Sequence, residues 1–154
     1  MKFFIQERTK KQNTSLLYGD YWFYMEPYDK YGFTSILVND IELNVNDEGR
    51  ITDVCGYCPL IEYKETNEFP EDYKNYSLIV ILDNLPVPGA SVRLTDVKGW
   101  PMYINKKKGW VCIGNPDTEN KQLIEFVPHC VATMEGQELI AVWLHPQKLP
   151  PLDH

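Results

Sequence analysis

Cysteine and histidine are the residues of this chain best suited to redox, metal or nucleophilic chemistry, and it has four and three of them. Cys55 and Cys58 are separated by two residues in the stretch Val54–Pro59, which reads VCGYCP. The C-x-x-C spacing occurs in redox dithiols and in one half of structural zinc sites. A thioredoxin-like dithiol is followed by a helix, whereas here Pro59 follows at once and Leu60–Lys64 alternates like a strand. We therefore expect no redox dithiol.

Zinc is the alternative chemistry for the same two cysteines. A structural zinc site takes four Cys or His ligands, commonly as two close pairs, so His129 with Cys130 or Cys112 would have to complete it. His129 and Cys130 are neighbours, which in a strand places their side chains on opposite faces. Cys112 and Cys130 lie in apolar segments, where a free cysteine behaves as a small core residue. The sequence predicts no metal and no cofactor, with Cys55 and Cys58 as the candidate ligands if zinc is bound.

Nucleophilic catalysis has no linear signature in this chain. No serine stands in a G-x-S-x-G elbow, and no H-E-x-x-H is present. A Cys112–His129 dyad requires only that the fold bring the two side chains together, but their apolar surroundings are more typical of core residues. We expect a protein without catalysis, while noting that a site assembled from distant residues leaves no linear trace.

Aromatic side chains crowd the segment from Tyr18 to Phe33, with acidic residues between them. In a strand, Trp22 and Tyr24 point to one face while Phe23 points to the other. Two interpretations follow. The strand is buried on both faces, because large rings dominate cores, or it exposes a Tyr/Trp platform with acidic neighbours, as protein interfaces do. On the second interpretation the candidate partner-binding residues are Asp20, Trp22, Tyr24, Glu26, Asp29 and Tyr31.

The elements that must position these residues are strands, because apolar and polar residues alternate along most of the chain. Turn residues between the alternating runs indicate hairpins. We expect hairpins from Ile41–Val45 to Arg50–Val54, from Pro101–Ile104 to Trp110–Ile113 around the lysines 106–108, and from Ile124–Met134 through Glu135–Gly136 to Leu139–Leu144, with a further short strand at Ala90–Thr95.

The fold class predicted from these runs is mainly β: a single-domain antiparallel sheet folded as a barrel or a sandwich. Ser77–Leu82 is apolar on both faces, which predicts the most buried strand. Pro70–Tyr76 is expected to form one or two short helical turns, because proline is favoured in a first helical turn. The domain is expected to span residues 1–145, followed by a proline-rich C-terminal tail over 146–154.

Charge is unevenly distributed along the chain. Gln12–Asp96 holds 15 acidic and 5 basic residues, or −10, whereas the rest holds 7 and 10, or +3, which sums to −7. An acidic body repels phosphate backbones, so we expect no nucleic-acid partner. No apolar run is long enough for a membrane span or a secretory signal. We therefore expect no membrane association and a cytoplasmic location, where thiols stay reduced.

These observations favour a small, acidic binding protein that holds a basic protein partner. Inhibitors of the immunity or antitoxin type, found in bacteria, have this composition because the nuclease-like toxins that they neutralise are basic. The alternative is an enzyme, or a β-barrel protein that binds a small ligand or carbohydrate in a pocket lined by Tyr and Trp.

Overall fold

The structure is a computed structural model that describes residues 1–8, 12–28, 34–81 and 89–152. Within these residues it contains strands and no helix, and so no helix long and apolar enough to cross a membrane. The strands are β1 (Lys2–Glu7), β2 (Ser15–Gly19), β3 (Trp22–Glu26), β4 (Thr34–Val38), β5 (Ile41–Val45), β6 (Ile51–Tyr57), β7 (Lys64–Glu65), β8 (Lys74–Ile81), β9 (Ser91–Arg93), β10 (Met102–Asn105), β11 (Trp110–Gly114), β12 (Gln122–Val127), β13 (Cys130–Glu135) and β14 (Glu138–Leu144).

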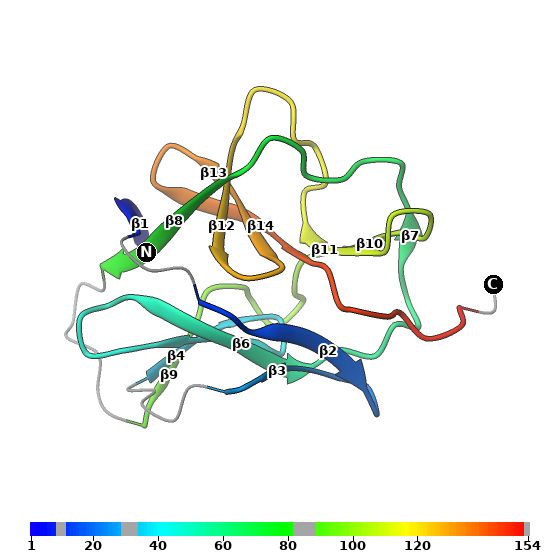
Figure 1. Cartoon of the computed structure of the whole chain (residues 1–154), viewed down its shortest axis with the longest axis horizontal. Helices are drawn as coiled ribbons and strands as arrows, with labels where there is room; N and C mark the ends of the chain where they lie inside the picture. The colour runs from blue at the N-terminus through cyan, green and yellow to red at the C-terminus, as the bar shows by residue number, and fades with distance from the viewer. Residues whose placement is uncertain (9–11, 29–33, 82–88, 153–154) are drawn as a thin grey trace.

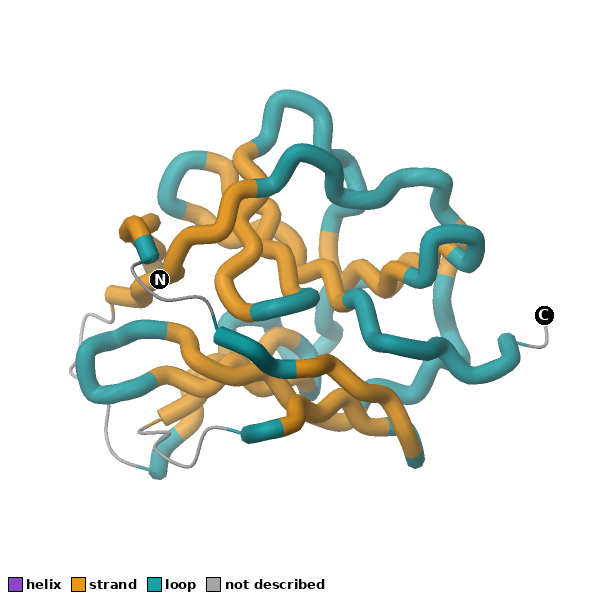
Figure 2. Tube along the Cα trace, viewed as in Figure 1, coloured by secondary structure: helices purple, strands orange, loops and turns teal. Residues whose placement is uncertain are grey.

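The strands form two sheets that pack face to face as a sandwich. One sheet has eight strands in the order β1-β8-β12-β13-β14-β11-β10-β7, and the other has six in the order β2-β3-β6-β5-β4-β9. Figure 1 shows the eight-stranded sheet above the six-stranded one, and Figure 2 shows the same two layers of strands. The mainly β fold is confirmed, and of the two predicted forms the structure has the sandwich. The sheets are mixed, because β7–β10, β8–β12 and β4–β9 pair in parallel.

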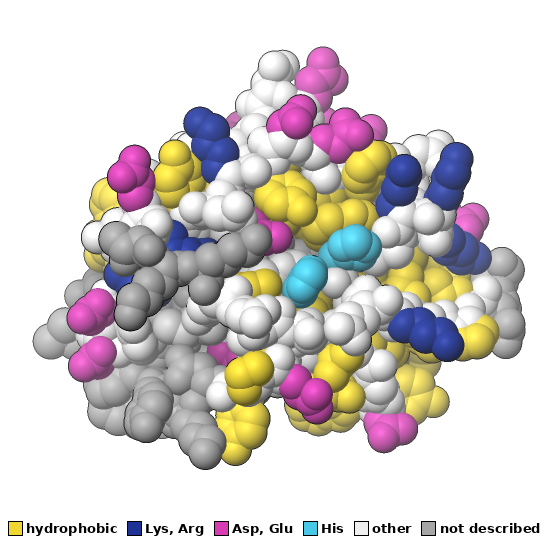
Figure 3. Space-filling model, in the orientation of Figure 1, with side chains coloured by type: hydrophobic (Ala, Val, Ile, Leu, Met, Phe, Trp, Pro, Cys, Tyr) yellow, Lys and Arg dark blue, Asp and Glu magenta, His cyan; other side chains and the backbone are white. Residues whose placement is uncertain are grey.

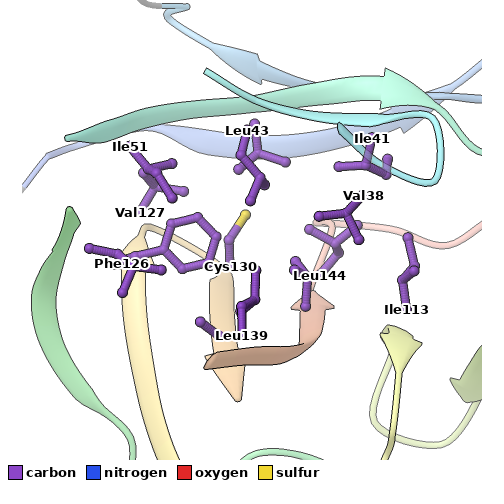
Figure 4. Close-up of a cluster of buried hydrophobic side chains, with 14 of the residues drawn as sticks. Val38, Ile41, Leu43, Ile51, Ile113, Phe126, Val127, Cys130, Leu139 and Leu144 are labelled. Atoms are coloured by element: carbon purple, nitrogen blue, oxygen red, sulfur yellow. The ribbon is translucent and has the colours of Figure 1, made fainter. Parts of the chain in front are cut away.

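The main core lies between the two sheets. Alternation along β5 turns Ile41, Leu43 and Val45 inward, and all three are fully buried. Figure 4 shows Ile41 and Leu43 facing side chains of the other sheet, such as Phe126 and Leu144. Burial of this apolar surface is the main source of stability for such a fold.

A second apolar cluster lies on the opposite face of the eight-stranded sheet. Along β14, Val142 and Leu144 belong to the main core, whereas the alternate residues Ala141 and Trp143 belong to this second cluster. Its buried members are Trp110, Cys112, Val131, Ala141 and Trp143, and Phe69, Tyr103 and Leu123 pack against them. The central strands of this sheet are therefore buried on both faces.

The first two predicted hairpins are present. β5 and β6 turn at Gly49, and β10 and β11 turn after the lysines at Gly109; both glycines have the positive φ that such turns favour. The predicted third hairpin is three strands, because the chain also turns at Pro128–His129 between β12 and β13. His129 takes φ +67° without being a glycine, so the glycine signal that marked the other turns was missing.

Two predictions around β8 are wrong. The expected helical turns are absent: Asp72 has φ +55°, which a right-handed helix excludes, and β8 begins at Lys74. β8 is also not the most buried strand, since Ile81 is 47% exposed while β11 is buried throughout. β8 lies next to the edge strand β1, and only one of its faces meets the core. Leu82 lies outside the described residues.

The segment after β14 runs along β2. The amide of Gln147 donates to the carbonyl of Leu16 over 3.0 Å, and Leu149 and Leu152 pack against the main core. Figure 1 shows this segment in red between the two layers. The segment thus covers part of the edge of β2.

Candidate functional site

The stretch VCGYCP forms the end of β6 and the residues after it. Cys55 pairs with Glu42 on the outward face of the six-stranded sheet, whereas Cys58 is buried in the main core beside Met102, with 3.7 Å between the two sulfur atoms. Positions i and i+3 of an extended strand point to opposite faces. Gly56, between them, has φ +142° and packs against the backbone of Asp40 and Ile41. The motif is therefore a strand end shaped by a close backbone approach.

The environment of the four cysteines keeps their thiols protonated at neutral pH. Burial, with the nearby Glu42 carboxylate, raises the pKa of Cys55 to about 11, and burial raises that of Cys58 to about 12. Burial also raises the pKa of Cys112 and of Cys130. Because the thiolate is the reactive form, these groups are poor nucleophiles. All four cysteines are free.

The remaining candidate ligands are not brought together. Cys130 lies in the main core, Cys112 lies in the second cluster on the other face of the sheet, and His129 is exposed in the β12–β13 turn. No group of three or more Cys, His, Asp or Glu side chains arranged to hold a metal ion occurs within residues 1–8, 12–28, 34–81 and 89–152. The Cys112 thiol lies near the carbonyl of Gly114, at 3.9 Å.

β3 exposes its aromatic residues on one face only. Phe23 and Met25 are buried in the main core, whereas Trp22 is 48% and Tyr24 is 40% exposed. The two exposed rings lie two residues apart, so they share the outward face of the six-stranded sheet. This arrangement corresponds to the second interpretation of the segment, in which the strand exposes an aromatic face to solvent.

Two further tyrosines extend the exposed rings across the neighbouring strand. Tyr57 of β6 pairs directly with Trp22, and their ring centroids are 5.8 Å apart in an edge contact. Tyr21 contacts the same tyrosine, with 6.5 Å between centroids. We call Tyr21, Trp22, Tyr24 and Tyr57 the β3–β6 aromatic surface. Sequence reasoning missed Tyr57, although its alternation with Cys55 and Asp53 was a usable signal.

The turn that presents Tyr21 is strained. Asp20 and Tyr21 have φ of +52° and +71° and join β2 to β3 as a two-residue hairpin turn. Such a turn favours Asn or Asp followed by glycine, because a Cβ in the left-handed region is unfavourable. The tyrosine is 57% exposed, so it contributes little to the core. The carbonyl of Tyr21 accepts a 2.7 Å hydrogen bond from the amide of Cys58, which fixes the turn against the end of β6.

Acidic side chains outnumber basic ones in the segments that carry the β3–β6 aromatic surface. Asp20 lies in the turn before β3, Glu26 is the last residue of β3, and both are exposed. Asp29 and Tyr31 lie outside the described residues. In residues 12–28 and 34–57 there are seven acidic side chains and one basic side chain, Arg50, whose guanidinium donates to Gln6 of β1. In the lower part of Figure 3, where β2 and β3 lie, hydrophobic side chains and acidic ones are neighbours at the surface.

No protein-family model matches this chain, and no curated protein sequence matches it either. The most distinctive feature of the described residues is an exposed aromatic surface on an acidic sheet face, presented in part by a strained turn.

Proposed function

We propose that the chain is a non-catalytic binding protein whose β3–β6 aromatic surface holds a basic protein partner. The partner class that fits is a nuclease-like toxin, and the chain would act as its inhibitor or immunity protein. Such toxins carry positive charge because they bind phosphate, and an acidic surface complements that charge. The alternative of an enzyme with a reactive thiol is less favoured, because all four thiol pKa values are raised.

The observation that carries this proposal is the exposure of four large rings in one contiguous group. Trp and Tyr are enriched among the residues that dominate binding free energy, because their rings bury much area and lose few rotamers. Scattered exposed apolar residues need no explanation, but a contiguous group does. The left-handed φ of Tyr21 adds to this, since backbone strain is concentrated at functional positions.

The acidic neighbours have a different role from the rings. Exposed carboxylates such as Asp20 and Glu26 speed the approach of a positive partner from a distance, and salt weakens this effect. The rings act after contact, when their burial slows dissociation. The proposal therefore assigns the on-rate to the charges and the off-rate to the aromatic surface.

Capture from a lysate of the source organism tests the proposal. The immobilised chain is expected to retain a basic protein that the Trp22→Ala, Tyr57→Ala double variant does not retain. A Phe4→Ala variant is the matched control, because Phe4 is an aromatic residue of similar exposure, 41%, on β1 of the other sheet. The captured protein is then assayed for nuclease activity with and without the chain, and inhibition is expected. Capture that survives the double variant, or a captured protein that is acidic, would contradict the proposal.

Replacing Tyr21 by glycine is expected to separate binding from stability. Glycine adopts the left-handed region freely, so the free energy of unfolding should stay unchanged or rise by up to about 1 kcal/mol. Partner binding should weaken, because a ring of the aromatic surface is lost. Chemical denaturation and a binding assay on the same variant check the two halves. A loss of more than about 1 kcal/mol in stability would show that Tyr21 is retained for the fold.

A further inference from the structure

A pocket of about 540 Å³ lies at one end of the strands of the eight-stranded sheet, and none of its lining residues belongs to the β3–β6 aromatic surface. It is bounded by the start of β10, the end of β11 and the turn between β13 and β14. Its walls combine aromatic, aliphatic and acidic side chains, among them Trp100, Tyr103, Pro116, Leu139, Glu135 and Glu138. Its volume is within the range of ordinary ligand sites.

Two aromatic residues reach the pocket, Trp100 from the side of the main core and Tyr103 from the side of the second cluster. The backbone of both is held in place before any ligand arrives. The side chain of Asn39 clamps the backbone of Trp100: its Oδ1 accepts from the Trp100 amide at 2.8 Å, and its Nδ2 donates to the Trp100 carbonyl at 3.0 Å. Tyr103 is fixed by the pairing of β10 with β11. Because this backbone is already ordered, it loses little conformational entropy when a ligand binds, which favours affinity.

The two carboxylates of the pocket differ in whether they already form an ion pair. The ammonium of Lys121 lies 3.2 Å from the Glu135 carboxylate, so this part of the pocket already attracts an ammonium group of the chain itself. The exposed Glu138 side chain has no ion pair within the described residues. Glu138 is therefore open to a cation from outside.

We propose that this pocket binds the side chain of a lysine presented by another polypeptide. The faces of Trp and Tyr rings attract a cation, and a neighbouring carboxylate strengthens that preference. Pro116 is partly exposed and offers apolar surface to the four-carbon stem, which lysine characteristically packs on such surface while its head stays charged. This site is independent of the β3–β6 aromatic surface and of the partner proposed for it.

Two model ligands test the site without any protein partner. Nα-acetyl-lysine methylamide and its uncharged counterpart, Nα-acetyl-norleucine methylamide, are titrated into the full chain while amide and indole resonances are followed by NMR. The lysine compound should bind with a dissociation constant on the order of 1 mM, as expected for so small a ligand. Saturable shifts are expected at the indole of Trp100, assigned from a Trp100→Phe variant, and at the amides of Gly114 and Leu139.

Three variants test whether the carboxylates of the pocket determine the affinity for the lysine compound. Glu138→Gln should weaken binding of the lysine compound several-fold, whereas Glu48→Gln, an exposed carboxylate on the β5–β6 turn, should not change it. Lys121→Gln should strengthen binding, because it frees Glu135. Glu138 and Glu48 are exposed and Lys121 is partly exposed, so the fold should tolerate the changes. Equal affinity for both compounds, no saturable shift, or an unchanged affinity in Glu138→Gln would overturn the proposal.

Discussion

A Trp143→Ala variant is expected to lose about 3–5 kcal/mol of unfolding free energy, the range for removing a fully buried large ring. Trp143 is completely buried in the second cluster, where its ring meets that of Trp110 edge-on at 6.3 Å. Its indole nitrogen donates to the Thr133 hydroxyl over 3.1 Å, so alanine also leaves a buried hydroxyl without this partner. Urea denaturation measures the loss.

Two companion variants separate the parts of this effect. Trp143→Phe keeps an aromatic ring and loses the hydrogen bond, so it should cost less than the alanine change. Ile81→Ala is the control for a half-exposed apolar residue of the same sheet and should cost under about 1 kcal/mol. If Trp143→Ala and Ile81→Ala cost the same, the second cluster does not stabilise the fold as the structure indicates.

A Gly56→Ala variant is the second change expected to have a large effect, about 4 kcal/mol. An added Cβ would overlap the carbonyl oxygen of Asp40 and lie 2.8 Å from the Cα of Ile41. Overpacking of this kind costs about 1–3 kcal/mol, and a φ of +142° adds strain of about 1–3 kcal/mol. The clash involves backbone, so no side chain can move aside to relieve it.

Gly136→Ala is the matched control for Gly56→Ala. Gly136 also has a positive φ, +61°, but nothing lies within 4 Å of an added Cβ there. Its cost should therefore be the backbone strain alone, about 1 kcal/mol. Thermal and urea unfolding of both variants measure the difference. A mild effect of Gly56→Ala would mean that β5 and β6 do not approach as closely as the structure shows.

Local sequence patterns predicted the strands of the β5–β6, β10–β11 and β13–β14 hairpins and their turns with glycine, because side-chain alternation and turn chemistry are properties of neighbouring residues. The same patterns did not predict the turn at Pro128–His129, and they predicted β8 as the most buried strand. β8 is apolar, but its exposure depends on its place beside the edge strand β1, which is a long-range property. The parallel pairs could not be predicted for the same reason.

The candidate site was predictable only in part. Alternation placed Trp22 and Tyr24 on one face, but only the packing of Phe23 and Met25 in the main core shows that this face is the outward one. Tyr57 joins them through the pairing of β3 with β6. In the same way, strand alternation places the side chains of Cys55 and Cys58 on opposite faces of the sheet, so the two cysteines of VCGYCP do not form a dithiol pair.

The proposed binding function is tested most directly by how fast the captured partner leaves a Trp22→Ala variant. Truncating a buried aromatic anchor costs about 2 kcal/mol or more, which corresponds to dissociation at least about 30-fold faster. The association rate should change little in this variant, whereas Asp20→Lys with Glu26→Lys should slow association and reduce its dependence on salt. Phe4→Ala should match the unaltered chain in both rates. A dissociation rate for Trp22→Ala equal to that of the unaltered chain, with both proteins folded, would contradict the assignment of the β3–β6 aromatic surface as the binding surface.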